Sequence, residues 1–233
     1  MSASPHAFWA VIPAAGVGRR MGAERPKQYL KLAGRTVIEH TLKRFLDRPE
    51  LLGVVVAVGP DDPYWPTLEC AADMRVERVT GGAERADSVC NALSALADRA
   101  RGSDWVLVHD AARPCLSEED LSRLLDRMRS HPVGGILATP VRDTMKRVNA
   151  AGEIEATVDR SALWHAQTPQ MFRLETLLNS LELAQRNGWT VTDEASAMEQ
   201  AGFRPCVVEG RADNIKITCP EDLEYAEWLL GAS

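Results

Sequence analysis

Short apolar runs that stop at Gly, Pro or Asp recur along this chain and alternate with segments of helical periodicity. Such runs are typical of buried strands in a parallel sheet, where both faces are covered. The helical segments space apolar residues three and four apart, as in Val37, Ile38, Leu42 and Phe45, which follow Thr36, a predicted N-cap. Strands are predicted at Phe8–Pro13, Leu52–Val58, Arg75–Val79, Asp104–His109, Gly135–Thr139 and Arg204–Val208.

Helices are expected between and after these strands. Ser117 is a predicted N-cap, and its spacing to Asp120 resembles a capping box. The alternation of strand and helix over the first ~140 residues predicts a doubly wound, mostly parallel, Rossmann-like α/β sheet. The length of 233 residues suits a single domain over 1–233. Further helices are predicted around Val89–Leu96, Leu121–Met128, Leu174–Gln185, Asp193–Gln200 and after Pro220.

The segment 140–159 interrupts the α/β alternation. Val141–Val148 and Glu153–Val158 have the composition of strands, and they flank Asn149–Gly152, which has the composition of a tight turn. This pattern predicts a β-hairpin. Because an isolated hairpin is marginally stable in water, we expect it to pack on a second subunit as a dimerisation arm, which predicts a homodimer.

Composition excludes several classes of protein. The chain has 27 Lys and Arg against 33 Asp and Glu, a net charge of -6, which argues against a general nucleic-acid binder. The five scattered cysteines contain no C-x-x-C pair and predict free thiols rather than disulfides or a metal cluster. No apolar run approaches the ~20 residues of a membrane span, and the first residues lack the pattern of a signal peptide. We therefore expect a cytoplasmic protein without membrane contact.

Small residues and cations follow the first predicted strand. Ala14, Ala15 and Gly16 would let backbone N–H groups approach phosphates. The stretch matches neither the dinucleotide fingerprint G-x-G-x-x-G nor the Walker A loop. Between Ala14 and Lys31 five cations face a single anion, Glu24, a local excess that suits a triphosphate with a leaving pyrophosphate. The five cations are Arg19, Arg20, Arg25, Lys27 and Lys31.

Further motifs follow in order along nearly the whole chain. Together with P-A-A-G-V-G-R-R-M-G and R-P-K-Q-Y, they make the chain resemble the 2-C-methyl-D-erythritol 4-phosphate cytidylyltransferases, which belong to the nucleotidylyltransferase superfamily. The other motifs are G-G-A-E-R-A-D-S-V from Gly81, H-D-A-A-R-P from His109, V-R-D-T-M-K from Val141, V-D-R from Val158, Q-T-P-Q from Gln167, T-D-E-A from Thr192 and N-I-K-I-T from Asn214.

The resemblance implies a reaction and the roles of four cations. CTP and 2-C-methyl-D-erythritol 4-phosphate would give 4-diphosphocytidyl-2-C-methyl-D-erythritol and pyrophosphate, with Mg²⁺, in the non-mevalonate synthesis of isoprenoid precursors. Arg20 and Lys27 match the family's transition-state stabilisers. Arg160 and Lys216 match the residues that hold the acceptor phosphate.

The resemblance also assigns a CTP-binding set: Ala14, Ala15, Gly16, Gly82, Ser88 and Asp110. Ala83 offers no polar side chain to the base, so any contact there must come from its backbone. Ser88 has an alternative role as a small residue inside a helix. Asp110 ends a predicted buried strand at the ligand-binding edge of the sheet, so it could take substrate hydroxyls or serve as a protein ligand to a Mg²⁺ held mainly by CTP phosphates. His109 is expected to order that loop rather than to titrate.

The acceptor-binding set implied by the resemblance is Asp110, Arg113, Thr144, Thr168 and Thr192. Arg113 is expected to pair either with a substrate phosphate or with Glu118, and Thr192 has an alternative role as the cap of the helix at Asp193. Because the hairpin is expected to cross to a second subunit, we predict that Thr144 and Arg160 serve the partner's active site.

Three alternatives remain open from the sequence. One is a cytidylyltransferase for another polyol phosphate, such as ribitol 5-phosphate, and another is a sugar-1-phosphate nucleotidylyltransferase that uses a different base. The third is a nucleotide-binding protein without activity, which would have no use for cations on both reacting phosphates. Pyrophosphate release from CTP that depends on the acceptor and on Mg²⁺ separates these classes.

Overall fold

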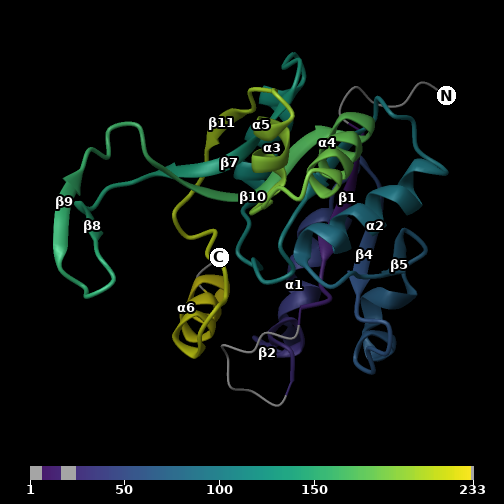
Figure 1. Cartoon of the computed structure of the whole chain (residues 1–233). Coiled ribbons are helices and arrows are strands. Elements are labelled where there is room, and N and C mark those ends of the chain that lie inside the picture. Colours follow the sequence, from purple (N-terminus) through teal and green to yellow (C-terminus); the bar gives the residue numbers. More distant parts are fainter. Residues whose placement is uncertain (1–6, 17–24, 232–233) are drawn as a thin grey trace.

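A seven-stranded sheet runs through the molecule in the order β11–β7–β10–β6–β1–β4–β5 (Figure 1). The computed structural model describes residues 7–16 and 25–231. Neighbouring strands are parallel, except that β10 runs antiparallel to both β6 and β7. The strands are β1 (Phe8–Pro13), β4 (Leu51–Val58), β5 (Val76–Thr80), β6 (Trp105–Val108), β7 (Gly134–Pro140), β10 (Trp164–Arg173) and β11 (Cys206–Glu209).

Helices cover both faces of this sheet, so the predicted doubly wound α/β class is confirmed. Along β1, Phe8, Ala10 and Ile12 pack in a core with α1 and α3, whereas Val11 packs on the opposite side with α2, α4 and α5. The helices are α1 (Val37–Leu46), α2 (Arg85–Ala97), α3 (Glu118–Met128), α4 (Leu174–Arg186), α5 (Glu194–Gln200) and α6 (Pro220–Gly231).

The predicted helix starts are confirmed at α1 and α3. The Thr36 side chain accepts from the Glu39 N–H and forms a full capping box with the Glu39 carboxylate. The Ser117 side chain accepts from the Asp120 N–H. Asp120 does not complete a box, because its carboxylate instead accepts from Arg123 and from the Arg211 N–H.

Five short elements lie at the edges of the two layers. Tyr29 packs in the core beneath α1 and α3, whereas Leu32 belongs to a smaller cluster with Ile217 and with Ala226 of α6. The five elements are the 3₁₀ helices η2 (Lys27–Tyr29), η3 (Trp65–Thr67) and η4 (Glu69–Ala72), and the two-stranded sheet of β2 (Lys31–Leu32) and β3 (Arg35–Thr36).

The segment 140–159 forms the predicted hairpin. Strands β8 (Met145–Val148) and β9 (Ile154–Val158) pair as a separate two-stranded sheet that extends away from the body (Figure 1). Its apolar side chains are exposed, with Val148 54% and Ile154 65% accessible. Such an arm has no core of its own to bury these side chains.

Two further expectations concern absences. Among the helices of residues 7–16 and 25–231, none combines the length and apolar character needed to cross a membrane. The five cysteines are free thiols in this structure.

Candidate active site

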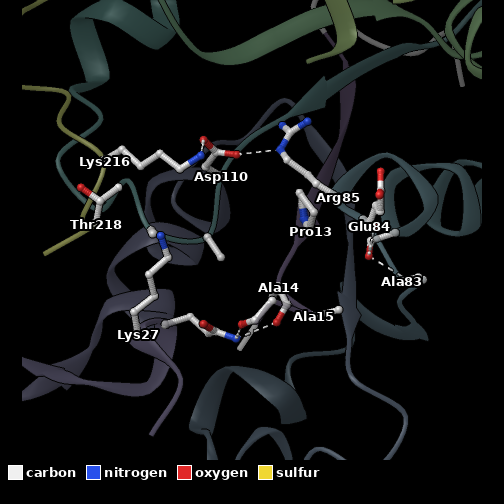
Figure 2. A pocket seen from close by; sticks show the side chains of 16 residues that line it. Pro13, Ala14, Ala15, Lys27, Ala83, Glu84, Arg85, Asp110, Lys216 and Thr218 are labelled. Atoms are coloured by element: carbon white, nitrogen blue, oxygen red, sulfur yellow. Dashed lines mark hydrogen bonds and ion pairs between the residues drawn. The ribbon is translucent and has the colours of Figure 1, made fainter. Parts of the chain in front are cut away.

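A cavity of about 390 Å³ opens at the carboxyl ends of β1 and β6. The chain places β4 and β5 on one side of β1 and then crosses to place β6 on its other side, so the direction of strand addition changes between β1 and β6. Ligands of open α/β sheets bind at this topological switch point. Segments far apart in the sequence build the cavity (Figure 2): the turn after β1, η2, the start of α2, the loop after β6 and the segment before α6. It is lined by Pro13–Gly16, Lys27, Gln28, Gly82–Arg85, Ser88, Asp110–Ala112, Lys216 and Thr218.

The predicted CTP-binding residues all line this cavity. Glycine is required at 81 and 82, because a Cβ at Gly81 would collide with the Cβ of Ala15, and one at Gly82 would collide with Asp87. The two small-residue turns therefore approach each other closely across the cavity.

Ser88 shapes one of these turns. Its hydroxyl accepts from the Gly82 N–H at 3.1 Å and lies 3.1 Å from the Glu84 carbonyl, to which it donates. Ser88 is 3% exposed and belongs to α2. Its proton is thus already engaged within the protein, so in this conformation Ser88 orders the Gly82 turn, and direct binding of the base by Ser88 stays a prediction.

Asp110 is the centre of charge in the cavity. Lys216 Nζ lies 2.9 Å from its Oδ2, Arg85 Nε lies 3.0 Å from its Oδ1, and Arg113 Nε lies 3.4 Å from Oδ2. Figure 2 shows Lys216 and Arg85 approaching the carboxylate from opposite sides. Burial alone would raise the pKa of Asp110, but the charges of Arg85, Lys216 and Arg113 outweigh burial and hold that pKa well below its usual range. Asp110 is therefore an anion surrounded by cations.

Arg85 is a site residue that the sequence reasoning missed. Its guanidinium binds Asp110 with Nε and both oxygens of Glu194 with its two terminal nitrogens, at 2.6 and 3.0 Å. Glu194, at the start of α5, is 1% exposed. Burial opposes the charge on Arg85, but the two carboxylates outweigh burial and raise its pKa. The sequence does contain a signal for Arg85, because this residue lies in the G-G-A-E-R-A-D-S motif. Roles were predicted there only for Gly82 and Ser88.

His109 and Thr168 fix the backbone beneath Asp110. The Thr168 hydroxyl accepts from the Asp110 N–H at 3.1 Å and lies 2.9 Å from His109 Nδ1. His109 Nε2 lies 3.0 Å from the Arg113 carbonyl. Because a carbonyl only accepts, Nε2 carries the proton and Nδ1 accepts from Thr168. Burial lowers the pKa of His109 to about 4, so the ring is neutral and orders the loop, as expected.

Arg113 requires a correction to one of its two predicted partners. It is 9% exposed, pairs with Asp110, and donates to the Asn214 carbonyl at 2.6 Å. Burial lowers its pKa. Glu118 instead lies 3.4 Å from Arg48 and is largely exposed, so the expected Arg113–Glu118 pair is wrong. Arg113 follows Asp110 by three residues, and the turn between them folds Arg113 back toward Asp110.

Three of the four predicted catalytic cations belong to the described residues, and they lie in two different places. Lys27 and Lys216 line the cavity, and Lys27 Nζ donates to the Ile217 carbonyl at 2.8 Å, which brings the two lysine segments together (Figure 2). Arg160 is exposed at the base of the hairpin arm, where Thr144 is exposed as well. Arg20 lies outside the described residues.

Thr192 is exposed just before α5 and does not line the cavity of this chain. The alternative that Thr192 caps α5 is wrong, because Asp193 is the cap and accepts from the Ser196 N–H. Thr168, by contrast, is buried directly behind Asp110. Contact of either hydroxyl with the acceptor stays a prediction.

The donors at Asp110 limit how a metal ion could bind. Within residues 7–16 and 25–231, no three His, Cys, Asp or Glu side chains gather in a way that could hold a metal. Both oxygens of Asp110 accept from cations, Oδ1 from one and Oδ2 from two, so a Mg²⁺ bound there would share the carboxylate with these cations. Direct binding of Mg²⁺ by Asp110 stays a prediction.

Comparison with known proteins identifies the family behind this geometry. A model of the 2-C-methyl-D-erythritol 4-phosphate cytidylyltransferase family matches residues 8–232. The chain belongs to this family. The family member from Pseudomonas putida (strain W619) is 60% identical over 220 residues, 94% of each chain. The member from Pseudomonas aeruginosa (strain PAO1) is 61% identical over 218 residues, 93% of each.

Solved structures of the family agree with the fold. The 2-C-methyl-D-erythritol 4-phosphate cytidylyltransferase of Francisella tularensis superposes with a TM-score of 0.84 at 39% identity, covering 96% of this chain and 99% of its own. The enzyme of Thermus thermophilus gives a TM-score of 0.78 at 32% identity, covering 95% and 98%. The cavity at the switch point therefore belongs to a chain that matches the family along almost its whole length.

Proposed function

We propose that this chain transfers the cytidylyl group of CTP to 2-C-methyl-D-erythritol 4-phosphate and releases pyrophosphate, a step in the synthesis of isoprenoid precursors. The observation that carries the proposal is the cation cluster of the cavity, in a chain of this family. Lys216, Arg85 and Arg113 surround the Asp110 carboxylate, and Lys27 lines the same cavity, so cations are concentrated there although the chain as a whole is acidic.

The chemistry explains why cations are needed. A phosphate oxygen of the acceptor attacks the α-phosphorus of CTP, the new P–O bond forms, and the bond from that phosphorus to the bridging oxygen of the β-phosphate breaks. The bonding pair leaves with pyrophosphate. Two anions must approach each other, so the protein acts by holding them in line and by opposing their charge. Lys27 is suited to the triphosphate, and Lys216 to the acceptor phosphate.

Mg²⁺ is proposed to enter on the phosphates of CTP, where it would neutralise part of their charge. The protein then needs no set of metal ligands, which agrees with the cations that already occupy both oxygens of Asp110. Asp110 would be left to orient Lys216 and Arg85 and to accept from a substrate hydroxyl.

A panel of substrates tests the proposed function. With purified protein, Mg²⁺ and 2-C-methyl-D-erythritol 4-phosphate, we expect pyrophosphate release from CTP and much less from UTP or ATP. With CTP, ribitol 5-phosphate should be a much poorer acceptor. Faster turnover with ribitol 5-phosphate would replace the proposed acceptor, and release without any acceptor would indicate a hydrolase.

The hairpin arm is proposed to complete the active site of a second copy. Its exposed apolar side chains need a partner surface, and it carries Arg160 and Thr144 at its base, both exposed. In a two-fold dimer the same arm on each chain could reach the cavity of the other. The proposal thus explains why two predicted site residues lie on the arm, apart from the residues that line the cavity.

Hybrid dimers test this arrangement. Lys27→Ala and Arg160→Ala homodimers should each be nearly inactive, whereas a hybrid of the two should recover about half of the wild-type activity, because one of its two sites is intact. The activity is measured on hybrids purified through two different affinity tags.

The control hybrid combines Lys27→Ala with Lys216→Ala. Both residues line the same cavity of one chain, so each site of this hybrid keeps one defect and activity should stay low. An inactive Lys27→Ala/Arg160→Ala hybrid of correct mass would refute the shared site.

A further inference from the structure

Gln28 lines the cavity but has no role so far. It lies in η2 between Lys27 and Tyr29 and is 4% exposed. Its amide nitrogen donates to two backbone carbonyls of the turn after β1, Ala14 at 2.7 Å and Gly16 at 3.0 Å. One buried side chain therefore joins the small-residue turn to the segment that carries Lys27.

These two hydrogen bonds determine which backbone groups the turn offers to a ligand. Ala14 continues the ladder of β1 by donating to the Ala57 carbonyl. The carbonyls of Ala14 and Gly16 are engaged by Gln28. Within the described part of the chain, the N–H groups of Ala15 and Gly16 make no hydrogen bond. A turn in which two carbonyls are engaged and two N–H groups are left unengaged favours the binding of an anion.

Tyr29, the residue that follows Gln28, is also fixed in position. The Tyr29 hydroxyl donates to Asp62 at 2.8 Å, and its ring packs on Tyr64 with centroids 5.2 Å apart. Burial, together with Asp62, raises the pKa of Tyr29, so the hydroxyl keeps its proton. Gln28 thus ties a fixed segment to the turn and sets the distance between the Lys27 backbone and the N–H groups of Ala15 and Gly16.

We propose that Gln28 is a positioning residue for the triphosphate: it holds the turn after β1 so that N–H groups, and not carbonyl oxygens, face the phosphates beside Lys27. This inference rests on the proposed function, because it concerns how the same cavity binds CTP. The acceptor phosphate is expected to bind on the side of Lys216 and Arg160, so Gln28 should affect CTP and pyrophosphate but not the acceptor.

The test replaces Gln28 with methionine, which has a similar length but no donor. Losing two hydrogen bonds that order the turn should raise the KM for CTP and the Kd for pyrophosphate by about 10- to 100-fold. The KM for the acceptor should stay near the wild-type value. Steady-state kinetics give both KM values, and calorimetric titration with pyrophosphate gives a binding constant that does not require turnover.

Gln170→Met is the matched control. Gln170 is 1% exposed, and its amide donates to Asp193 at 2.8 Å, but it does not line the cavity. Its loss should lower the melting temperature without changing the KM for CTP. A folded Gln28→Met protein with wild-type KM for CTP would overturn the proposal.

A second variant, Gln28→Glu, tests the proposal if Gln28→Met does not fold. Gln28→Glu preserves shape but places a carboxylate against two carbonyls, and protonation restores one donor. Its KM for CTP should therefore fall toward the wild-type value as the pH is lowered, more steeply than for the wild type. If the KM for CTP of Gln28→Glu depends on pH in the same way as that of the wild type, or if neither variant folds, Gln28 has a structural role only. Absence of wild-type turnover would refute the proposed function, while pyrophosphate titration would still test Gln28.

Discussion

Replacing Lys27 with alanine should lower kcat by about 10²- to 10³-fold and leave the free energy of unfolding nearly unchanged. Lys27 lines the cavity from η2, and its ammonium lies 2.8 Å from the Ile217 carbonyl, next to Lys216 in the chain. In the transition state, negative charge is spread over the phosphoryl oxygens and the departing pyrophosphate. A fixed ammonium opposes that charge without reorganising, whereas water in the enlarged cavity would have to reorient.

Lys31→Ala is the control for net charge. Lys31 belongs to the cation-rich stretch of the sequence, but the structure places it outside the cavity lining, exposed and four residues after Lys27. Its removal therefore makes the same change in net charge without removing a side chain from the cavity. We expect kcat for Lys31→Ala near the wild-type value. Rates are measured by pyrophosphate release at saturating CTP and acceptor, and melting temperatures confirm folding. If kcat falls equally in both variants, Lys27 acts only through the overall electrostatic field of the protein.

Buried apolar runs made most of the sheet predictable. Val54–Val58 and Val106–Val108 lie in strands covered on both faces, where a continuous apolar sequence is required. The predicted boundaries of these two strands differ from the structure by at most one residue. The location of the residues that follow these strands could then be predicted as well, because the carboxyl ends of parallel strands meet at one edge of the sheet. The small-residue turn after β1 and Asp110 after β6 could therefore be assigned to one site from sequence.

Strand β10 could not be predicted in the same way. It lies in the middle of the sheet, yet it contains Gln167, Thr168, Pro169 and Gln170, a composition that suggests a loop. Its register with β7 shifts between Ala166 and Gln170, which accommodates the proline.

Distant residues form hydrogen bonds with the polar side chains of β10. Gln170 donates to Asp193, Gln167 donates to the Arg211 carbonyl, and Thr168 accepts from the Asp110 N–H. None of these partners is a neighbour in sequence, so the hydrophobic periodicity of the chain does not indicate them. For the same reason Arg85 had no predicted role, since its carboxylate partners come from two other segments of the chain.

Replacing Arg85 with methionine should cost about 3–5 kcal/mol of unfolding free energy at neutral pH, because it leaves the buried Glu194 carboxylate without its bidentate partner. Asp110 also loses one of its cations. Burial would raise the pKa of Asp110, but Arg85 is the foremost of the charges that hold that pKa below its ordinary value. The ionised form of Asp110 thus contributes stability that is complete above about pH 4 and is lost as the pH falls through its folded pKa.

The difference in unfolding free energy between wild type and Arg85→Met should therefore be largest near neutral pH and shrink below about pH 4, as measured by urea denaturation across that range. Arg75→Met is the control, because Arg75 is 45% exposed and its pair with Asp73 lies at the surface. An exposed pair is worth about 0–1 kcal/mol, so this variant should change little. Equal losses in the two variants would show that Arg85 acts through its aliphatic packing, and that the buried charges at the back of the cavity do not depend on its guanidinium.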